Sequence, residues 1–429
     1  MPDEPAQGRL LVLRHPDLRR YLSARFLVGV ATQIQTVAVG WQVFSATGDP
    51  FDLGLVALSQ FLPFVLLILP AGHVADHYDR RRVQLATYVL LAACSIALLA
   101  LSIYGVTDIG PVLAVMAVFG VARAFNLPVG QALLPNLAPM SLFPRAMAVN
   151  SSLGQVATIA GPAVGGALVL FGVEVAFGLA VVLLLAGVVL AAGLRGGGRD
   201  SEASREPISW ATLLSGVAFV RSKPIVLGSI SLDLFAVLFG GATALLPIYA
   251  GDVLGVGPVG LGIMRASPAI GAAVLAAAVS IRPIRSRVGR WMFGGVAAFG
   301  VATIVFGLST SFALSVAALV VMGAGDMVSV YIRNMLVQLE TPDEIRGRVS
   351  AVNSVFIGAS NELGEFESGV TAAWWGIVPA VVVGGAATLA VTAAWTRLFG
   401  VLWRLDRFPD HRGVALRRGE YDQPHSGKP

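Results

Sequence analysis

The sequence predicts an all-α membrane protein with twelve transmembrane helices in two pseudo-symmetric six-helix bundles. Three observations carry this prediction: the composition, the spacing of the apolar runs and the one-sided placement of the basic residues. Of the 429 residues, 56% are hydrophobic and only 13% are charged, whereas about a quarter of a soluble domain is charged. The mean hydropathy is +0.77. A chain of this composition is suited to lipid rather than to water.

Each predicted helix is an apolar run long enough to cross a bilayer, which takes about 20 residues. Charge clusters or Gly and Pro breaks separate the runs. We expect the spans at residues 22–45, 54–74, 83–104, 111–133, 145–170, 174–194, 224–250, 257–281, 291–309, 312–339, 348–373 and 376–396.

The basic residues set the expected orientation. The chain has 30 Lys and Arg, and nearly all of them lie in the two tails, the central linker and every second loop. The remaining loops carry only acidic charges, at Asp49, Asp52, Asp108, Glu174 and Asp252. Because basic loops stay on the cytoplasmic side, we expect both termini to be cytoplasmic in a cell (inner) membrane. The N-terminal segment shows no cleavage site, so we expect it to be retained.

The linker "RGGGRDSEASREP" divides the spans six and six. We therefore expect an N-terminal bundle over 1–194, a cytoplasmic linker over 195–223, a C-terminal bundle over 224–400 and a cytoplasmic tail over 401–429. The end of the linker, "ISWATLLSGVAFVRSK", could form an amphipathic helix on the membrane surface.

The two halves also echo each other in sequence. "PMSLFPRAMAVNS" (139–151) aligns with "PDEIRGRVSAVNS" (342–354), which matches Arg145 to Arg348 and Asn150 to Asn353. Internal repeats in transporter folds place the substrate near the midplane between the halves.

The motif "GHVADHYDRRR" (72–82) follows the second span. Taken alone, its arginines could be only a topology signal. In a twelve-span chain, it resembles the loop between helices 2 and 3 of the major facilitator superfamily, and the matching residues are Gly72, Asp76, Arg80 and Arg81. The resemblance implies that Asp76 meets the start of helix 11 near Arg348 as a latch. Asp79 replaces a glycine of the family pattern, which puts the tight turn in question.

A second motif, "GPAVGG" in span 5, is similar to the signature of the antiporter branch of this superfamily. Its residues are Gly161, Pro162, Gly165 and Gly166. The resemblance implies export rather than uptake, whereas the alternative is ordinary packing of small residues between membrane helices.

Three further segments, "WQVF" (41–44), "RAFNLPVGQALLPNLAP" (123–139) and "NELGEFESG" (361–369), resemble one branch of the superfamily. This branch holds the enterobactin exporter and the macrolide-efflux proteins, and the resemblance covers residues 14–400. It implies the major facilitator fold, in which helices 1, 4, 7 and 10 line the cavity.

Ionisable groups within the bilayer are functional candidates by default, because burying their charge is costly. Arg123, Asp233 and Asp326 fall near mid-depth, and span 1 adds Gln33 and Gln35. Arg123 and Asp326 occupy matching positions of the two repeats. The alternative is a structural ion pair that holds the halves in register.

Span 11 carries Gly358, Glu362, Glu365 and Gly369 on one helical stripe, whereas Glu367 points away. Two carboxylates on adjacent turns repel each other, so that one of them can bind a proton near neutral pH. We interpret the pair as the proton-coupling site. Alternatively, it binds a cationic substrate or pairs with Arg265.

We therefore expect a secondary active transporter: a proton-coupled antiporter that exports a small amphipathic molecule, drug-like or siderophore, by alternating access. A facilitator, an importer and a non-transporting sensor remain alternatives. An enzyme is not expected, because no HExxH or GxSxG motif occurs. The expected partners are a small-molecule substrate, protons and membrane lipid. We expect no cofactor, metal or nucleic acid, and a monomeric protein.

Overall fold

The computed structural model describes residues 14–105, 108–196, 210–342 and 345–409. Within these ranges the regular structure is entirely helical. The elements are α2 (Pro16–Thr47), α3 (Pro50–His77), α4 (Arg80–Tyr104), α5 (Gly110–Leu137), α6 (Phe143–Val169), α7 (Val173–Ala192), α8 (Trp210–Ser222), α9 (Pro224–Gly240), η1 (Ala242–Leu245), α10 (Leu246–Ile248), η2 (Tyr249–Val253), α11 (Gly257–Ile281), α12 (Val288–Leu308), α13 (Phe312–Glu340), α14 (Arg346–Trp375), α15 (Ile377–Leu398) and α16 (Gly400–Trp403).

Eleven segments of the described chain are long and apolar enough to cross a membrane, with α9 to η2 counted as one. The twelfth long helix is α14, which has 30 residues but also the acidic run that begins at Glu362. These acidic residues lower the mean hydropathy of α14, so it is not among the eleven apolar spans. The predicted fold class, all-α and spanning the membrane many times, is confirmed.

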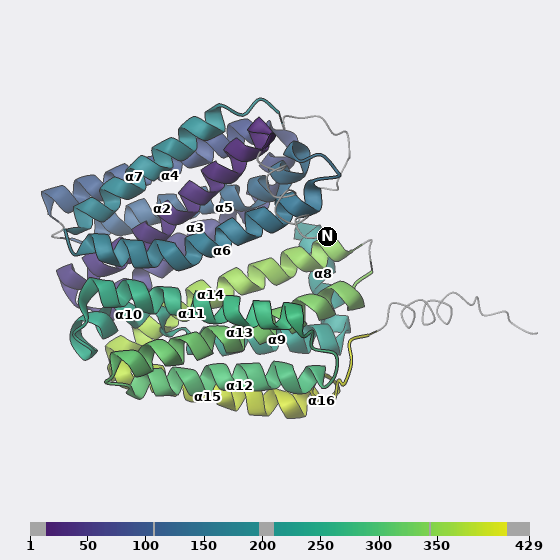
Figure 1. The fold of residues 1–429 in the computed structure, drawn as a ribbon. Coiled ribbons are helices and arrows are strands. Elements are labelled where there is room, and N and C mark those ends of the chain that lie inside the picture. The colour runs from purple at the N-terminus through teal and green to yellow at the C-terminus, as the bar shows by residue number, and fades with distance from the viewer. Residues whose placement is uncertain (1–13, 106–107, 197–209, 343–344, 410–429) are drawn as a thin grey trace, which may run out of the picture.

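The long helices form two groups, which lie one above the other in Figure 1. Helices α2 to α7 pack on one another as the N-half, and α9 to α16 pack on one another as the C-half. The main contacts between the halves are α3 against α14 and α6 against α11.

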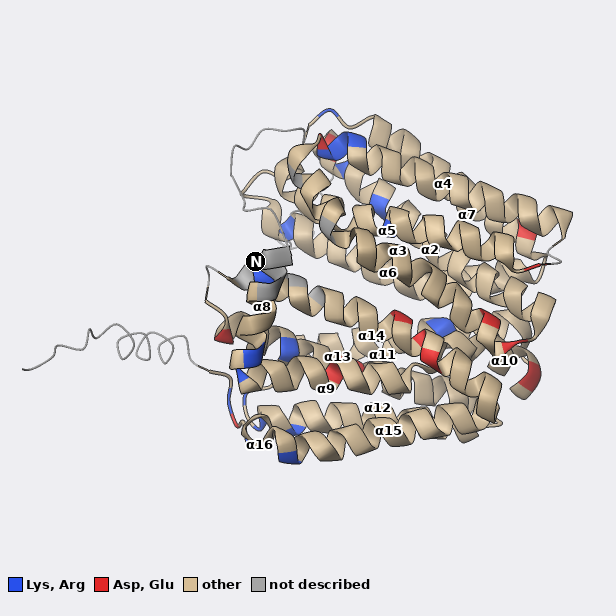
Figure 2. Ribbon diagram, turned by 180° about the vertical axis from the view of Figure 1, so that it is seen from behind, with Lys and Arg blue, Asp and Glu red and all other residues tan. Residues whose placement is uncertain are grey.

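The two ends of the molecule differ in charge, as Figure 2 shows. Helix ends at one side carry Arg80, Arg81, Lys223, Arg287 and Arg404, and we call this side the basic end. The opposite end carries the acidic helix ends and loops. There, Asp49 caps α3 by accepting a hydrogen bond from the Phe51 amide at 2.8 Å, the usual role of Asp at this position.

The halves are packed tightly at the opposite end. A Cβ atom on Gly166 of α6 would lie only 2.8 Å from the Gly262 Cα of α11, and one on Gly369 of α14 would lie 2.8 Å from the Gly54 Cα of α3. Only glycine permits helices to approach this closely.

The buried apolar clusters show the same asymmetry between the two ends. One cluster runs across both halves and joins Val39 of α2 to Leu245 and Tyr249 of the C-half. At the basic end, clusters stay within one half, such as the one around Leu133 in the N-half and the one around Val349 in the C-half. The interface between the halves is thus closed at the opposite end.

The seventh span, predicted as one continuous helix over 224–250, is broken. Helix α9 ends at Gly240, Gly241 leaves the helical region, and the chain continues as the 3₁₀-helix η1. The Gly241 carbonyl accepts a hydrogen bond from Ser368 Oγ of α14 at 3.0 Å. A backbone carbonyl released within a membrane needs such a partner. The sequence pattern predicted the length of this span but not its break.

The predicted linker helix corresponds to α8, while residues 197–209 lie outside the described chain. Helix α8 packs on α14 and α9, and Val220 is buried with Val226 and Val352. A Cβ on Gly216 would lie 3.0 Å from the Arg348 carbonyl oxygen. The described part of the linker is therefore docked on the basic end of the C-half.

Candidate functional site

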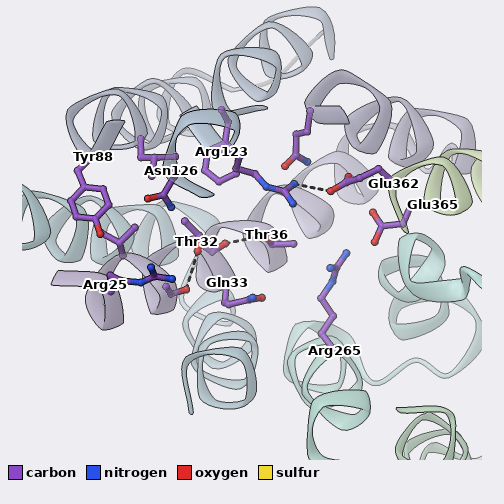
Figure 3. Close-up of a pocket in the computed structure, with 15 residues that line it drawn as sticks. Arg25, Thr32, Gln33, Thr36, Tyr88, Arg123, Asn126, Arg265, Glu362 and Glu365 are labelled. Atoms are coloured by element: carbon purple, nitrogen blue, oxygen red, sulfur yellow. Dashed lines mark hydrogen bonds and ion pairs between the residues drawn. The ribbon is translucent and has the colours of Figure 1, made fainter. Parts of the chain in front are cut away.

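A cavity of about 380 Å³ lies between the two halves. Figure 3 shows side chains from both halves converging on it. Most of its lining is polar or charged. The lining residues are Arg25, Val28, Gly29, Thr32, Gln33, Thr36, Gln60, Tyr88, Leu91, Phe119, Arg123, Asn126, Arg265, Glu362 and Glu365.

Helix α2 contributes six of the fifteen lining residues. Its polar lining residues Arg25, Thr32 and Thr36 recur at spacings of seven and four, which places them on one face of an α-helix. Thr32 and Thr36 direct their hydroxyl groups to carbonyl oxygens one turn earlier, at 2.9 Å in each case. The backbone thereby satisfies both hydroxyl protons, and the oxygens remain available as acceptors in the cavity.

Arg123 of α5 and Glu362 of α14 form an ion pair across the cavity. The distance from Arg123 Nη1 to Glu362 Oε1 is 2.7 Å. The Arg123 guanidinium also lies 5.7 Å from the centre of the Phe64 ring, a cation–π distance. The pair links the N-half to the C-half, and the Arg123 side chain remains 41% exposed.

Glu365 lies one turn beyond Glu362 and is held by the broken seventh span. Its Oε1 atom accepts a hydrogen bond from Thr243 Oγ1 of η1 at 3.0 Å. Figure 3 shows Glu365 and Arg265 of α11 pointing toward one another. No ion pair joins them, and the Arg265 Nε atom is buried with no hydrogen-bond partner in the described chain.

Arg25 of α2 lines the part of the cavity nearer the basic end. Its Nη1 atom donates to the Tyr21 hydroxyl at 3.0 Å, and that hydroxyl donates to the Gly130 carbonyl at 2.6 Å. A Cβ on Gly130 would lie 2.5 Å from Arg25 Nη1. The glycine therefore makes room for the guanidinium.

Four of the seven residues predicted for the substrate and proton pathway line this cavity: Gln33, Arg123, Glu362 and Glu365. Gln35 does not. It is buried and its Oε1 atom accepts a hydrogen bond from Ser95 of α4, because residues two apart on a helix point to different faces.

Asp233 and Asp326 also lie away from the cavity lining. Asp233 is buried inside the C-half, where it forms an ion pair with Arg333 and accepts a hydrogen bond from Ser329 Oγ at 3.0 Å. Asp326 is half-buried on α13. The pairing of Arg123 with Asp326, considered from the repeat, is wrong in this conformation, because Arg123 pairs with Glu362.

The motif after the second span is only partly described. The backbone of Asp76 lies in α3, but its side chain is outside the described residues, so the latch stays a prediction. Gly72 is buried, and Arg80 Nε donates to the Ala75 carbonyl at 3.1 Å.

The questioned turn of this motif is stabilised by Asp79, which caps α4. Asp79 Oδ1 accepts from the Arg81 amide at 2.9 Å, and the Arg81 guanidinium pairs with the Asp79 carboxylate at 3.0 Å. Arg81 Nη1 also donates to the Arg195 carbonyl at 2.6 Å. An N-cap carboxylate thus forms this turn where the family pattern has a glycine.

The "GPAVGG" motif packs against both neighbours of α6. Cβ atoms on Gly161 and Gly165 would lie 2.5 Å from Gln33 Cβ and 3.0 Å from Ile34 Cα of α2. Gly166 and the Pro162 carbonyl face Gly262 of α11, in the other half. The motif therefore contacts a cavity-lining helix on one side and the interface between the halves on the other.

Two functional candidates, Arg25 and Thr243, were not assigned to the site from sequence, and Arg265 was considered only as a partner for the two glutamates. The rule that marks intramembrane charges as functional applies to cations as well as to carboxylates, so it could have identified both arginines. Thr243 gave no signal beyond the preceding Gly-Gly pair, which marks the break. Glu367, expected to point away, is half-buried and does not line the cavity.

Comparison with known proteins agrees with this architecture. A family model described as "Transmembrane secretion effector" matches residues 10–406. Multidrug efflux pump Tap of Mycolicibacterium fortuitum is 28% identical over 363 residues, covering 80% of this chain and 86% of the pump. Enterobactin exporter EntS of Escherichia coli is 25% identical over 350 residues, covering 80% of this chain and 82% of the exporter.

Among solved structures, a bacterial homologue of the human lysosomal transporter Spinster, inward-facing and unoccupied, aligns with a TM-score of 0.69. The identity is 13%, and the alignment covers 98% of this chain and 100% of that chain. At this identity the likeness shows the fold alone. The resemblance predicted from the motifs is confirmed by the family match: the protein is a multi-pass membrane transporter, not an enzyme, and it belongs to the transmembrane secretion effector family of the major facilitator superfamily.

Proposed function

We propose that this transporter exports a small molecule by alternating access through the cavity between its halves. The observation that carries the proposal is the Arg123–Glu362 ion pair. It joins the two halves across a cavity, and the interface between the halves is tightly packed at the opposite end. A charge pair of this kind must break when the halves move apart, so substrate binding and movement act on the same residues.

The orientation follows from the charge of the two ends. The basic end faces the cytoplasm when the protein lies in a bacterial inner membrane. In this orientation, the described conformation is closed toward the outside. We take residues 1–194 and 224–400 as the two moving bodies and 195–223 as their cytoplasmic linker. One chain is enough for this scheme, because residues of a single chain line the whole cavity.

We infer the substrate class from the substrates of the relatives and from the side chains that line the cavity. Tap is a multidrug efflux pump and EntS exports a siderophore, so a drug-like or siderophore-like molecule is the natural range. Apolar cavities suit lipophilic drugs, whereas this lining has arginine, glutamate, amide and hydroxyl groups with a few apolar residues. An amphipathic molecule with several polar oxygens fits this lining better than a purely lipophilic one.

Exchange for protons is the first candidate for the driving reaction. Glu365 is the proton-binding residue in this scheme, because it faces a second carboxylate, Glu362, and is not in an ion pair. Protonation and release on opposite sides of the membrane would alternate with substrate binding. The "GPAVGG" contacts at the interface support the antiporter assignment that the motif suggested.

A facilitator driven by the membrane potential is the second candidate. It is favoured by one specific observation, namely that three arginines face two glutamates in the cavity lining. A site with excess positive charge can carry an anion outward, and a negative interior favours that movement without any proton.

Transport in everted vesicles separates the two candidates. We expect a panel of amphipathic fluorescent compounds to accumulate under an imposed pH gradient, and Glu365→Gln to abolish this accumulation. Glu367→Gln is the matched control, because it makes the same change on the same helix outside the cavity lining. Accumulation that follows only the membrane potential and survives Glu365→Gln would favour the facilitator. If no compound moves under either gradient, transport through this cavity is contradicted.

A further inference from the structure

The cavity contains more guanidinium groups than carboxylates, and only one of its arginines has a carboxylate partner. Arg123 is paired with Glu362 at 2.7 Å. In the described chain, Arg25 and Arg265 are in no ion pair. Arginine keeps its charge in proteins, so with both glutamates ionised the lining carries one net positive charge.

Arg265 is the stronger of the two indications. Its Nε atom is buried without a hydrogen-bond partner, although a buried donor without a partner costs about 1–3 kcal/mol. Its guanidinium points into the cavity toward Glu365 (Figure 3) but forms no ion pair with it. Glu365 is instead bound by Thr243. The end of the Arg265 side chain therefore faces the cavity without a carboxylate bound to it in the described chain.

Arg25 repeats this arrangement nearer the basic end. Its side-chain partner is the neutral Tyr21 hydroxyl, and the absence of a side chain at Gly130 leaves the space that the guanidinium occupies. By the helical rise, Arg25 lies about 14 Å from the basic end of α2, and Arg265 about 12 Å from the opposite end of α11. The two cations therefore bracket the cavity along the membrane normal.

We propose that the cavity recognises anionic oxygen groups of its substrate, carboxylates or groups of the same shape, with Arg265 as one contact and Arg25 as a second, separate contact farther along α2. A guanidinium presents a planar fork of donors that matches two carboxylate oxygens. The amides of Gln33, Gln60 and Asn126 line the space between and can bind further oxygens of the same molecule. This inference rests on the proposed function in one respect, that this cavity is the substrate site.

The inference also bears on the driving reaction. The charged groups that face Glu365 are Glu362 on its own helix, Arg265 on α11 and Arg123 on α5. A proton on Glu365 removes a negative charge opposite Arg265, so it strengthens the attraction of an anion. Proton and anion then favour each other's binding. Direct exchange would instead require them to compete. An anionic substrate therefore weighs against direct exchange for protons at Glu365.

Binding of citrate to the purified full-length protein, freed of lipid in detergent, tests the proposal without requiring transport. We expect citrate to raise the Tm in a saturable way, because a ligand that binds the folded state stabilises it. Triethyl citrate keeps the skeleton but lacks the carboxylates, and spermidine carries the opposite charge; neither should raise the Tm.

The variants assign the effect to the cavity. Arg265→Gln should weaken citrate binding about tenfold, the loss of one charged hydrogen bond, and Arg25→Gln should weaken it less. Arg265→Lys keeps the charge and should recover part of the affinity, which covers the case in which Arg265→Gln does not fold. Arg407→Gln is the matched control, because Arg407 is exposed at the basic end and lies outside the cavity lining.

Three results would overturn the assignment: no citrate response in the wild type, an equal response in the wild type and the folded Arg265 variants, or stabilisation by spermidine instead. Displacement of citrate by a short-chain phosphatidylglycerol but not by soluble dicarboxylates would assign the site to a lipid headgroup rather than a substrate. Citrate binding without any vesicle transport would uphold the anion site and contradict the proposed export.

Discussion

Within the described residues, the membrane-spanning part contains two ion pairs between different helices, which differ in burial and in the halves that they connect. Asp233 and Arg333 belong to the same half and have side-chain exposures of 5% and 2%. Arg123 and Glu362 belong to different halves and have exposures of 41% and 14%. The first pair is enclosed by the packing of α9 and α13, whereas the second faces the cavity between the halves.

This difference distinguishes an ion pair that stabilises one half from an ion pair that would take part in the proposed transport cycle. Two helices of one half keep their contacts when the halves move as bodies, so the Asp233–Arg333 pair can remain formed throughout a cycle. In the proposed cycle the Arg123–Glu362 pair cannot, because its partners would move apart. Breaking a pair is also less costly in a hydrated cavity than in a dry interior. A charge buried in a membrane protein is therefore not sufficient evidence that it takes part in transport.

The largest effect is expected from breaking the buried pair. Arg333→Ala leaves the Asp233 carboxylate unpaired in the interior, which costs about 3–5 kcal/mol. We expect severe loss of folded protein, measured as the yield and Tm of the detergent-purified protein. Asp233→Leu combined with Arg333→Met should recover much of the Tm, because apolar replacements of similar size are often tolerated.

Recovered transport in this double variant would confirm that the pair is structural. A double variant that folds as well as the wild type but transports nothing would contradict the distinction between the two pairs.

The second expected effect is on activity rather than stability. Arg123→Ala removes a partner that is 41% exposed, and exposed pairs contribute less than buried ones, so the Tm should fall far less than in Arg333→Ala. Transport should fall by more than tenfold, because the charge that joins the halves across the cavity is lost. Initial rates in everted vesicles measure this, with Arg407→Gln as a control that removes an exposed arginine.

Unchanged transport in Arg123→Ala would show that the cavity pair is a passive contact. A large fall in Tm would place it in the structural class with Asp233 and Arg333.

These pairs also show what could be predicted from the sequence. The depth of each charge follows from its distance to the helix ends, and Arg123, Asp233 and the two glutamates were all located in spans in this way. Partners could not be assigned, because depth does not fix the rotation of a helix or its neighbours. The repeat suggested Asp326 for Arg123, but the pair forms with Glu362 instead.

The fold could be predicted from the sequence more fully than the site, for a physical reason. The length of an apolar run and the charge of a loop are sums over individual residues, so one sequence is enough to predict them. The break after Gly240 depends on contacts from other helices: Ser368 Oγ donates to the Gly241 carbonyl, and Thr388 Oγ1 donates to the Ala236 carbonyl at 3.0 Å. No local pattern near residue 240 contains these donors.

A smaller effect is expected from Thr243, which connects this break to the cavity. Thr243→Val keeps the shape but removes the hydroxyl that donates to Glu365 at 3.0 Å. We expect transport to slow several-fold while citrate binding and the Tm are largely kept, because only the position of one carboxylate is loosened. Thr243→Ser retains a hydroxyl and should transport at close to the wild-type rate.

Equal rates for the valine and serine variants would show that the hydrogen bond does not position Glu365. The break would then be a packing feature of the C-half alone.

The smallest effect is expected at Asp79, a third charged pair that lies outside the membrane-spanning part. The Arg81 side chain, which donates to the Asp79 carboxylate at 3.0 Å, holds the pKa of this carboxyl below its usual value. A carboxyl with a lowered pKa in the folded state stabilises the fold above its ordinary pKa, and this contribution is lost as the pH falls through the folded-state value. Asp79→Ala should therefore lower the Tm slightly at neutral pH, by the loss of an N-cap worth about 1 kcal/mol, and the difference from wild type should shrink below about pH 4. Asp79→Asn keeps a capping oxygen but loses the charge, so its Tm should lie between those of Asp79→Ala and the wild type at neutral pH.

If the difference in Tm between Asp79→Ala and the wild type stays constant from neutral to acid pH, the cap acts through its hydrogen bond to the Arg81 amide alone. Arg81 would then owe its position to the Arg195 carbonyl and not to the Asp79 carboxylate.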